Sequence, residues 1–292
     1  MSGAASVAVI VPVHNGARFL AATLAAVRAQ TLPPDELWVV DDGSQDDSAE
    51  IAAEAGARVL RQANAGPGAA RNRALAATNC EFVAFLDADD LFLPDKLARQ
   101  VQVLRAAPAA LAVCGDAWTL GGPRDGERRH AGRPIEPRLH LVDLLRQNPV
   151  ITSSVLARRA AVVQVGGFDE APVLIATEDY DLWLRMLGLP GGHFLYLAEP
   201  LLRYRVHDQA LSGSGRFVAG LDRIAEKLAA VHTQSADVAA GMRARRVEAR
   251  LDAAWDCLQR GERAGARAWL AQARSLGGRS RKAAKLWLRS WL

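Results

Sequence analysis

Residues 82–90 read FVAFLDADD, an apolar run that ends in three carboxylates. The run over residues 82–86 is rich in Phe and Val and too short for a helix, so it predicts a buried strand. In an open α/β sheet, the carboxyl ends of the strands face the ligand crevice. Asp87, Asp89 and Asp90 would repel one another there. A divalent cation, bound by one or two of them and by a substrate's phosphates, would offset this repulsion. We therefore expect a metal–diphosphate site.

Strands and helices alternate on the N-terminal side of this stretch. Strands are predicted at residues 6–13, 37–40 and 58–61, and helices at residues 17–30, 45–55 and 67–77. Ser44 is expected to cap the second helix with Asp47 as its capping-box partner, and Gly56 to end that helix. This alternation indicates βαβ units and a mostly parallel sheet.

The pattern is less regular beyond Asp90. We expect a strand at 110–114, an exposed loop at 121–137, a short helix at 139–146, a β-rich run at 152–156, an amphipathic helix at 178–187 and a strand pair or meander at 193–205. From Gly215 onward, helix breakers are few and helices are predicted. The expected organisation is an α/β domain over residues 1–213 and a helical C-terminal extension over residues 214–292.

Three further loops follow predicted strands and would lie at the same edge of the sheet. They contain residues 14–16, 41–44 and 64–72. Together they supply a carboxylate for a base or ribose, backbone amides at a helix N-terminus, and an arginine for phosphate. This combination predicts a nucleotide site that lacks the glycine spacing of the common dinucleotide and P-loop motifs.

The ordered motifs VIVPVHNG, VVDDGSQDDS, NAGPGAARN and FLDADD resemble those of the family 2 glycosyltransferases, which have the GT-A fold. The resemblance continues with GGFDE at 166–170, TEDYDLWLR at 177–185 and YRVHDQALS at 204–212, and so covers roughly residues 6–212. It implies a mostly parallel α/β sheet with helices on both faces. It also implies inverting transfer of a sugar from a UDP- or dTDP-sugar to an acceptor hydroxyl, with Mn²⁺ or Mg²⁺ as cofactor.

The same resemblance assigns four residues to the nucleotide. Pro12 and His14 would lie where the first loop contacts the nucleotide. Asp42 would read the uracil-like edge of the base, and Arg71 would lie near the base and the phosphates. The acceptor would be a glycan, a lipid-linked glycan or a protein, in the synthesis of a bacterial surface glycan or glycoconjugate.

The resemblance also gives roles to the carboxylate stretch. Asp87 would meet the ribose or a metal-bound water, and Asp89 would bind the metal. His207 would complete the metal site or close over the diphosphate. Ala88 and Asp90 would belong to the sugar-nucleotide contacts, although Asp90 could instead cap the next helix.

Asp179 matches the catalytic base of inverting members of the family. The chemistry needs such a group, because an acceptor hydroxyl must lose its proton to a carboxylate about 3 Å away. A carboxylate on the predicted helix 178–187, separate from the metal-binding set, meets this need. The alternative is a helix N-terminal acid that only stabilises the helix dipole.

Two other classes of protein stay open. A catalytically silent sugar-nucleotide-binding protein would have no need of intact Asp87, Asp89 and Asp179. A nucleotidyltransferase shares the sheet topology and the metal, but normally has a Gly-rich loop with Arg and Lys after the first strand. Residues 14–17 read His-Asn-Gly-Ala instead.

Positive charge is concentrated at the end of this chain. The net charge is +4, yet residues 241–292 hold 13 Lys and Arg against 4 Asp and Glu. On a helix, Arg281, Lys282, Lys285 and Arg289 would share one face, and Ala284, Trp287, Leu288 and Trp291 another. Residues 279–292 are therefore a candidate for peripheral contact with anionic lipid. Docking on the chain's own domain or on a second subunit is the alternative.

Other composition features favour a cytoplasmic protein without a nucleic-acid partner. Cys80, Cys114 and Cys257 show no disulfide or zinc spacing, which fits a reducing compartment. Residues 1–13 have no basic n-region and are expected to form a first strand rather than a signal peptide. No apolar run reaches 18 residues, so no membrane span is expected.

Overall fold

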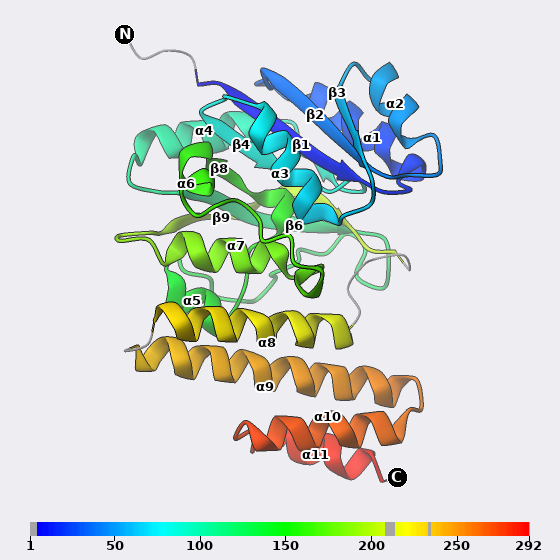
Figure 1. Ribbon diagram of the computed structural model, residues 1–292, viewed down its shortest axis with the longest axis vertical. Helices are drawn as coiled ribbons and strands as arrows, with labels where there is room; N and C mark the ends of the chain where they lie inside the picture. Colours follow the sequence, from blue (N-terminus) through cyan, green and yellow to red (C-terminus); the bar gives the residue numbers. More distant parts are fainter. Residues whose placement is uncertain (1–4, 208–213, 233–234, 292) are drawn as a thin grey trace. The chain divides into compact units, whose positions relative to one another are not determined.

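The computed structural model of the chain describes residues 5–207, 214–232 and 235–291 (Figure 1). Two compact units are present. The first contains Met1–Leu141, Pro149–Pro172 and Leu182–Gln209, and the second contains Val142–Asn148, Val173–Asp181 and Ala210–Leu292. The expected domain boundary at 213/214 and the end of the motif at 204–212 involve residues outside the described part, so that division stays a proposal. No helix in the described ranges combines the length and apolarity needed to cross a bilayer.

The first unit is built on one sheet in the order β3-β2-β1-β4-β8-β6-β9-β5, with β7 beside β9. Its strands are β1 (Val7–Val13), β2 (Glu36–Asp42), β3 (Arg58–Gln62), β4 (Phe82–Phe85), β5 (Leu91–Phe92), β6 (Ala112–Leu120), β7 (Arg138–Leu139), β8 (Leu156–Arg158) and β9 (Phe194–Arg205). The four strands β3, β2, β1 and β4 are parallel. Beyond β4 the sheet is mixed, because β8 is antiparallel to both β4 and β6, whereas β6 and β9 are parallel.

Helices cover both faces of this sheet. The first unit contains α1 (Ala17–Arg28), α2 (Ser48–Glu54), α3 (Pro67–Ala77), α4 (Lys96–Ala106), α6 (Arg159–Gln164) and the end of α7 (Glu178–Leu187). Successive strand side chains point to opposite faces. Phe82 and Ala84 accordingly share a core with residues of α1 and α4. Phe85 points the other way, and its ring lies 5.2 Å from that of Phe168 and 5.9 Å from that of Trp183 on α7. The predicted α/β class is confirmed.

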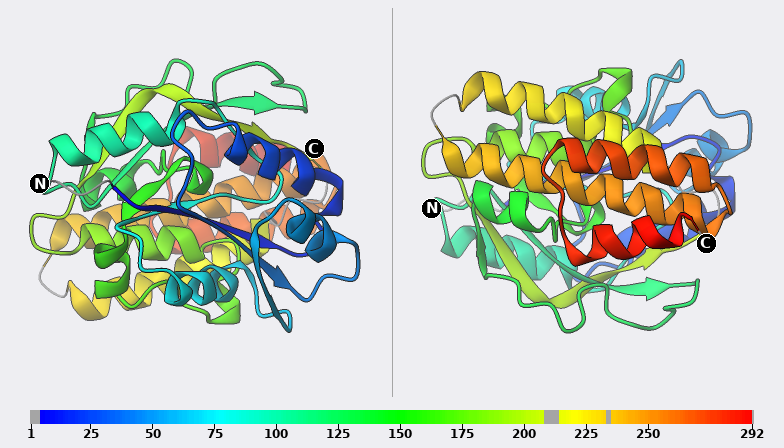
Figure 2. Two further views of the ribbon diagram at one scale, coloured as in Figure 1. Left: turned by 90° about the horizontal axis from the view of Figure 1, so that it is seen from above. Right: turned by 90° about the horizontal axis from the view of Figure 1, so that it is seen from below.

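The second unit consists mainly of helices. It contains most of α5 (Leu141–Arg146), and α8 (Ser214–Val231), α9 (Ala236–Gln259), α10 (Arg263–Ser275) and α11 (Arg281–Arg289). Figure 2 shows α8, α9 and α10 packed in sequence order, with α11 beside α9 and α10. The helices predicted from residue 215 onward are therefore confirmed.

The predicted start of the second helix is wrong. Ser44 does not cap it: its amide donates to Asp41 Oδ1 (2.9 Å) and its hydroxyl accepts from the Asn15 amide (3.0 Å). With Ser44 engaged in the loop, α2 begins only at Ser48. Gly56 does follow the end of α2 with a φ of +64°, as expected for a residue that ends a helix.

Two strand predictions also differ from the structure. Residues 152–154 form a 3₁₀ turn rather than a strand, because the Ser153 and Ser154 hydroxyls accept hydrogen bonds from the backbone amides of Asp87 and Gly115. The meander expected over residues 193–205 is the single strand β9. It pairs with β6 from Phe194 to Arg205, with a shift in register on either side of Asp116 where β9 contains extra residues: Gly115 lies opposite Leu197, Asp116 opposite Pro200 and Ala117 opposite Leu202.

Lys96 is a buried amine at the start of α4. Its side chain is 1% exposed, its Nζ donates to Gln100 Oε1 (2.7 Å), and it lies 4.1 Å above the Phe92 ring. Burial lowers the pKa of Lys96 well below its ordinary value of 10.5. Between this lowered pKa and 10.5, the folded chain therefore binds fewer protons than the unfolded chain, and folding stability rises as pH rises through that interval.

We predict that Lys96→Met flattens the dependence of stability on pH. Above the depressed pKa and below 10.5, the wild-type slope should be steeper than that of Lys96→Met by up to about 1.4 kcal/mol per pH unit. Urea unfolding at several values between neutral pH and pH 9 measures both slopes. Lys285→Met, at an exposed position, is the matched control and should keep the wild-type slope. Equal slopes for Lys96→Met and wild type would contradict the prediction.

Candidate functional site

The loops singled out from the sequence leave the sheet at one edge. In the parallel register, Val13 of β1 lies opposite Asp41 of β2, and Ile10 of β1 lies opposite Phe85 of β4. Residues 14–16, 43–44 and 86–90 therefore follow the ends of neighbouring strands, and Asp42 is the last residue of β2, as expected for a ligand site in such a sheet. Pro12 itself is buried within β1, opposite Val40.

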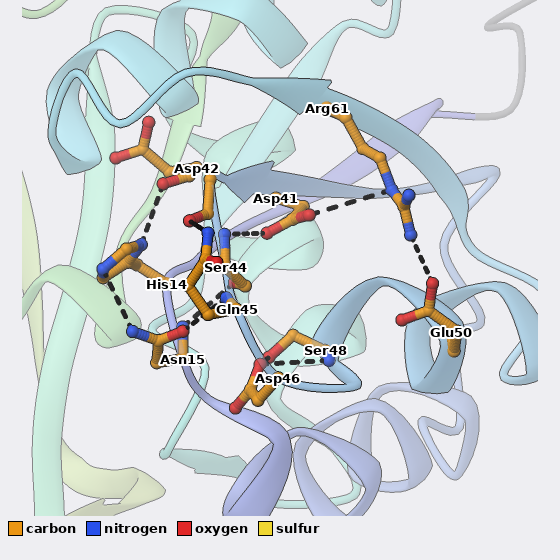
Figure 3. Close-up of polar contacts among 11 residues, drawn as sticks. His14, Asn15, Asp41, Asp42, Ser44, Gln45, Asp46, Ser48, Glu50 and Arg61 are labelled. Carbon is orange, nitrogen blue, oxygen red and sulfur yellow. Dashed lines mark hydrogen bonds and ion pairs between the residues drawn. The ribbon is translucent and has the colours of Figure 1, made fainter.

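His14 is held between the first and second loops (Figure 3). Its Nδ1 lies 2.9 Å from the Asp42 carbonyl oxygen, which requires the proton on Nδ1. Nε2 can then accept from the side-chain amides of Asn15 and Asn64, each 3.2 Å away. His14 is exposed to solvent although both of its ring nitrogens have protein partners.

Asp42 organises the loop that leads into α3. Its Oδ1 accepts from Gln62 Nε2 and from the Ala65 amide, and its Oδ2 accepts from the Gly66 amide, all at 2.8 Å. Gly66 has a φ of +92°, a conformation that favours glycine. The carboxylate is 3% exposed. Asp42 thus shapes the loop. A nucleotide base could hydrogen-bond to Asp42 only through the carboxylate lone pairs that these three bonds do not use.

Asp46 was not singled out from the sequence, yet it joins the first two loops. Figure 3 shows its contact with Ser48. Its Oδ2 accepts from the Ala17 amide at the start of α1 (2.9 Å), and its Oδ1 accepts from the Ser48 hydroxyl (2.5 Å). Burial alone would raise the pKa of Asp46, but these hydrogen bonds outweigh burial and lower it. Only its position four residues after Asp42 in VVDDGSQDDS marks it in the sequence.

Arg71 and Asp87 form an ion pair across the site. Arg71 Nη2 donates to Asp87 Oδ1 at 2.6 Å. The arginine side chain is 5% exposed, whereas that of Asp87 is 37% exposed, so the carboxylate reaches solvent and the guanidinium lies behind it. The guanidinium also lies 5.3 Å from the Phe168 ring centroid. Asn72 Nδ2 donates to the Phe168 carbonyl (2.8 Å), which ties the GGFDE segment to α3.

Asp89 and His207 form a second pair, with His207 Nε2 2.7 Å from Asp89 Oδ2. The two side chains are 31% and 19% exposed, respectively. Burial and then the charge of Asp87 raise the pKa of Asp89, and His207 acts in the opposite direction. The structure therefore brings together the two residues predicted to bind the metal.

Asp90 is the buried member of the stretch, with 1% exposure. Its Oδ1 accepts from the Arg205 backbone amide at 2.8 Å, and its Oδ2 has no hydrogen-bond partner among the residues that the structure describes. Burial, followed by the charges of Asp87 and Asp89, raises its pKa well above the ordinary value. The alternative in which Asp90 caps the next helix is wrong, because Asp95 occupies the N-cap position of α4.

Arg205 and Tyr204 are neighbours of the carboxylates that sequence reasoning did not assign. Arg205 Nε donates to the Asp89 carbonyl (2.8 Å), and its guanidinium lies 4.4 Å from the Phe19 ring centroid. Burial and then the charges of Asp90 and Asp87 raise the pKa of Tyr204 to about 12. Both residues are in the YRVHDQALS motif, and this motif is the sequence signal that could have identified them as neighbours of the carboxylates. Ala88 is fixed through its carbonyl, which accepts from the Thr23 hydroxyl (2.9 Å).

The donor set fits a hard divalent cation that is shared with a substrate. No three His, Cys, Asp or Glu side chains gather as a metal site within the described residues. Asp89 and His207 would supply two ligands, and phosphate oxygens and water would complete the shell, as is usual for Mg²⁺ at phosphate sites. Burial raises the pKa of Asp89 most, and the negative charge of Asp87 raises it further; a bound cation would relieve this second effect.

Asp179 lies in the first turn of α7, in the part assigned to the second unit. Three carboxylates share this turn. Glu178 and Asp181 are buried, and Asp181 pairs with Lys227 Nζ at 2.6 Å. Asp179 is only half-buried, and its Oδ1 accepts from the adjacent Tyr180 amide at 2.7 Å. Of the three, Asp179 is the one that reaches solvent.

Comparison with known proteins identifies relatives of the chain. The sequence profile described as Glycosyl transferase family 2 matches residues 8–165. EpsH of Bacillus subtilis, described as a glycosyltransferase, is 36% identical over 220 residues, which are 69% of this chain and 61% of EpsH. TuaG of the same organism, described as a teichuronic acid biosynthesis glycosyltransferase, is 26% identical over 71% of this chain and 82% of its own length. The first four curated relatives are Rickettsia proteins, and the chain aligns with 32–64% of their length.

Solved structures share the fold. TarS of S. aureus, residues 1–349 in complex with UDP, matches 83% of this chain and 70% of its own with a TM-score of 0.64 and 20% identity. A mannosyltransferase of Pyrobaculum calidifontis, in complex with GDP-Man and Mn²⁺, matches 98% of this chain and 79% of its own with a TM-score of 0.62 and 20% identity.

We predict that Asp42→Asn destabilises the chain even without a nucleotide. The NH₂ group that replaces one carboxylate oxygen cannot accept a hydrogen bond, so at least one of the three donors to Asp42 loses its partner, at a cost of about 1–3 kcal/mol. Urea unfolding of the ligand-free protein measures the loss. Asp47→Asn, at an exposed position whose side chain makes no capping bond, is the control and should change stability little. If both variants were equally stable, Asp42 would not hold the loop.

Proposed function

The chain belongs to glycosyl transferase family 2, and we propose that it transfers a sugar with inversion from a UDP- or dTDP-sugar to an acceptor hydroxyl. The observation that carries this proposal is the carboxylate stretch after β4, in which Asp87 pairs with Arg71 and Asp89 pairs with His207. The nucleotide-type loops around His14 and Asp42 follow adjacent strands. Because the chain spans only part of several relatives, the activity of the whole protein is part of the proposal.

The ligands of structural neighbours support a diphosphate-linked donor. TarS was solved with UDP, and the Pyrobaculum mannosyltransferase with GDP-Man and Mn²⁺. In this chain we assign the nucleotide to Pro12, His14 and Asp42, and its phosphates to Arg71. UDP- and dTDP-sugars are the proposed donors, and a GDP-sugar belongs in the same assay panel.

Asp87, Ala88 and Asp90 would complete the donor site. Asp87 is the most open of the three carboxylates and would meet the ribose or a metal-bound water. Asp90 is almost fully buried, so its contact with the donor sugar would require the unpartnered Oδ2. Asp89 and His207 would hold Mn²⁺ or Mg²⁺. When bound, the cation supplies Lewis-acid neutralisation of the leaving diphosphate.

We assign proton removal to Asp179. Its carboxylate would take the acceptor's hydroxyl proton while the hydroxyl oxygen bonds to the anomeric carbon and the nucleoside diphosphate leaves. The sugar then passes through an oxocarbenium-like transition state. Glu178 and Asp181 are weaker candidates, because both are buried and Asp181 is already paired with Lys227.

The proposed acceptor is a bacterial surface glycan or glycoconjugate, with the reaction in the cytoplasm. The name of the relative TuaG, which refers to teichuronic acid biosynthesis, supports this class of acceptor. An assay of the products also distinguishes the rival activities. Release of UDP or dTDP supports sugar transfer, release of pyrophosphate would indicate a nucleotidyltransferase, and donor binding without turnover of any acceptor would indicate a silent binding protein.

We predict that Asp89→Asn weakens UDP binding mainly when metal is present. The substitution removes the anionic ligand, so affinity with Mn²⁺ should fall at least about tenfold, while affinity in EDTA should change little. Isothermal titration calorimetry under both conditions measures this difference. Asp95→Asn, an exposed change of the same kind nearby, is the control. Wild-type affinity for UDP that is the same in Mn²⁺ and in EDTA would refute the metal assignment.

We predict that Asp179→Asn separates catalysis from binding. It keeps the side-chain shape but removes the base, so kcat should fall by roughly 10²–10⁴ while affinity for donor and metal stays near that of wild type. Initial rates and donor-binding isotherms for the same preparation test this. Asp169→Asn in the GGFDE segment offers a control outside the proposed site. Turnover of Asp179→Asn close to wild type would place the base elsewhere.

A further inference from the structure

Helix α11 is attached to the second unit along one face only. Leu286 is 4% exposed and belongs to a core with Leu251 and Leu270, and Ala283 packs against the same core. Ser290 is fully buried, and its carbonyl accepts from Arg267 Nη1 (2.7 Å). The helix therefore docks on its own unit, which is the alternative to lipid contact that the sequence analysis gave.

A second face of α11 carries large apolar side chains into solvent. Trp287 is 39% exposed, Leu288 65% and Trp291 64%. The two indole rings contact each other edge to face, with centroids 6.2 Å apart. Docking of the helix through Ala283 and Leu286 leaves this face uncovered. Covering this face would take three large apolar side chains of the described residues out of contact with water.

Positive side chains border the apolar face. Arg281 and Lys285 are exposed and form no ion pair with a carboxylate in the parts of the chain that the structure describes. Lys282 differs, because Glu248 and Asp252 neutralise it.

A third cation, Arg267, lies at the edge of this face, whereas Arg289 lies on the opposite side of α11 over another aromatic ring. The guanidinium of Arg267 lies 4.7 Å from the Trp291 ring centroid, and that of Arg289 lies 5.0 Å from the ring of Trp255, which is itself 39% exposed. Arg267 therefore adds a cation beside Trp291 to those supplied by Arg281 and Lys285.

We propose that the surface formed by Arg281, Lys285, Trp287, Leu288 and Trp291, here called the α11 surface, binds the headgroup region of an anionic lipid bilayer. An amphipathic helix with an apolar face and flanking cations is suited to lie in a membrane interface. Tryptophan is favoured there because its ring is apolar and its N–H remains hydrated.

Charge distinguishes this occupant from a second copy of the chain. Residues 241–292 carry 13 Lys and Arg against 4 Asp and Glu. Two copies meeting through the α11 surface would bring two such positive segments together, which is unfavourable. An anionic lipid surface instead attracts basic residues within about one Debye length.

The proposal predicts that the full chain co-sediments with vesicles of phosphatidylglycerol and phosphatidylcholine at low salt, and far less with phosphatidylcholine alone. Trp287→Ser with Trp291→Ser should reduce the bound fraction at least about fivefold at any salt concentration. Arg281→Gln with Lys285→Gln should reduce it at low salt and lose its effect at high salt, where charges are screened. Arg216→Gln with Arg223→Gln, on exposed positions of α8, removes the same charge elsewhere and should leave binding unchanged.

Two further measurements separate a loss of membrane binding from a loss of folding or activity. Thermal unfolding and soluble-acceptor turnover of each variant should match wild type, because the substituted side chains are exposed. The fluorescence of wild-type tryptophan should shift to the blue with anionic vesicles, as the indoles leave water. If wild type ignores anionic vesicles at low salt, the proposal is wrong. A second copy would instead be the occupant if wild type forms a dimer in sedimentation equilibrium and the double tryptophan variant does not. The proposal is wrong in that case if vesicles also bind neither wild type nor the variant.

Discussion

Electrostatic repulsion among Asp87, Asp89 and Asp90 is the constraint on which the candidate site depends. Each carboxylate has a different environment in the structure. Asp87 is open to solvent and paired with the buried Arg71, and Asp89 is paired with His207. Asp90 is buried, accepts from a backbone amide, and has a raised pKa. A stretch with this much negative charge in so small a space favours a ligand that brings positive charge.

The fold creates this concentration of charge through its parallel strands. Because β1, β2 and β4 run in the same direction, their following loops emerge together, and each loop is tied to the next. His14 bonds to the Asp42 carbonyl, and the Asp42 carboxylate holds the amides that precede α3. The helix α3 in turn carries Arg71 to Asp87. The nucleotide-type loops and the carboxylate stretch are therefore one connected network of hydrogen bonds.

The sequence predicted the elements whose pattern is local. The strand before Asp87 was clear because a short apolar run ended in carboxylates. The family resemblance gave His207 to the metal site or to the diphosphate, and in the structure its Nε2 lies 2.7 Å from Asp89 Oδ2. Ser44 was misassigned because its hydroxyl bonds to a loop 29 residues away, which no local pattern reveals. Asp46 and Arg205 were missed for the same reason. Their partners lie in other loops and strands, so only the tertiary structure shows what they hold.

The central claim is that the carboxylate stretch binds a divalent cation together with a nucleoside diphosphate. Within the described residues Asp89 and His207 offer two metal ligands, and no cluster of three is present. Electron paramagnetic resonance titration of free Mn²⁺, with and without UDP, tests this claim directly. Mn²⁺ should bind weakly alone and at least about tenfold more tightly with UDP, because the phosphates complete its ligand shell. Equal Mn²⁺ affinity in the presence and absence of UDP would contradict the account.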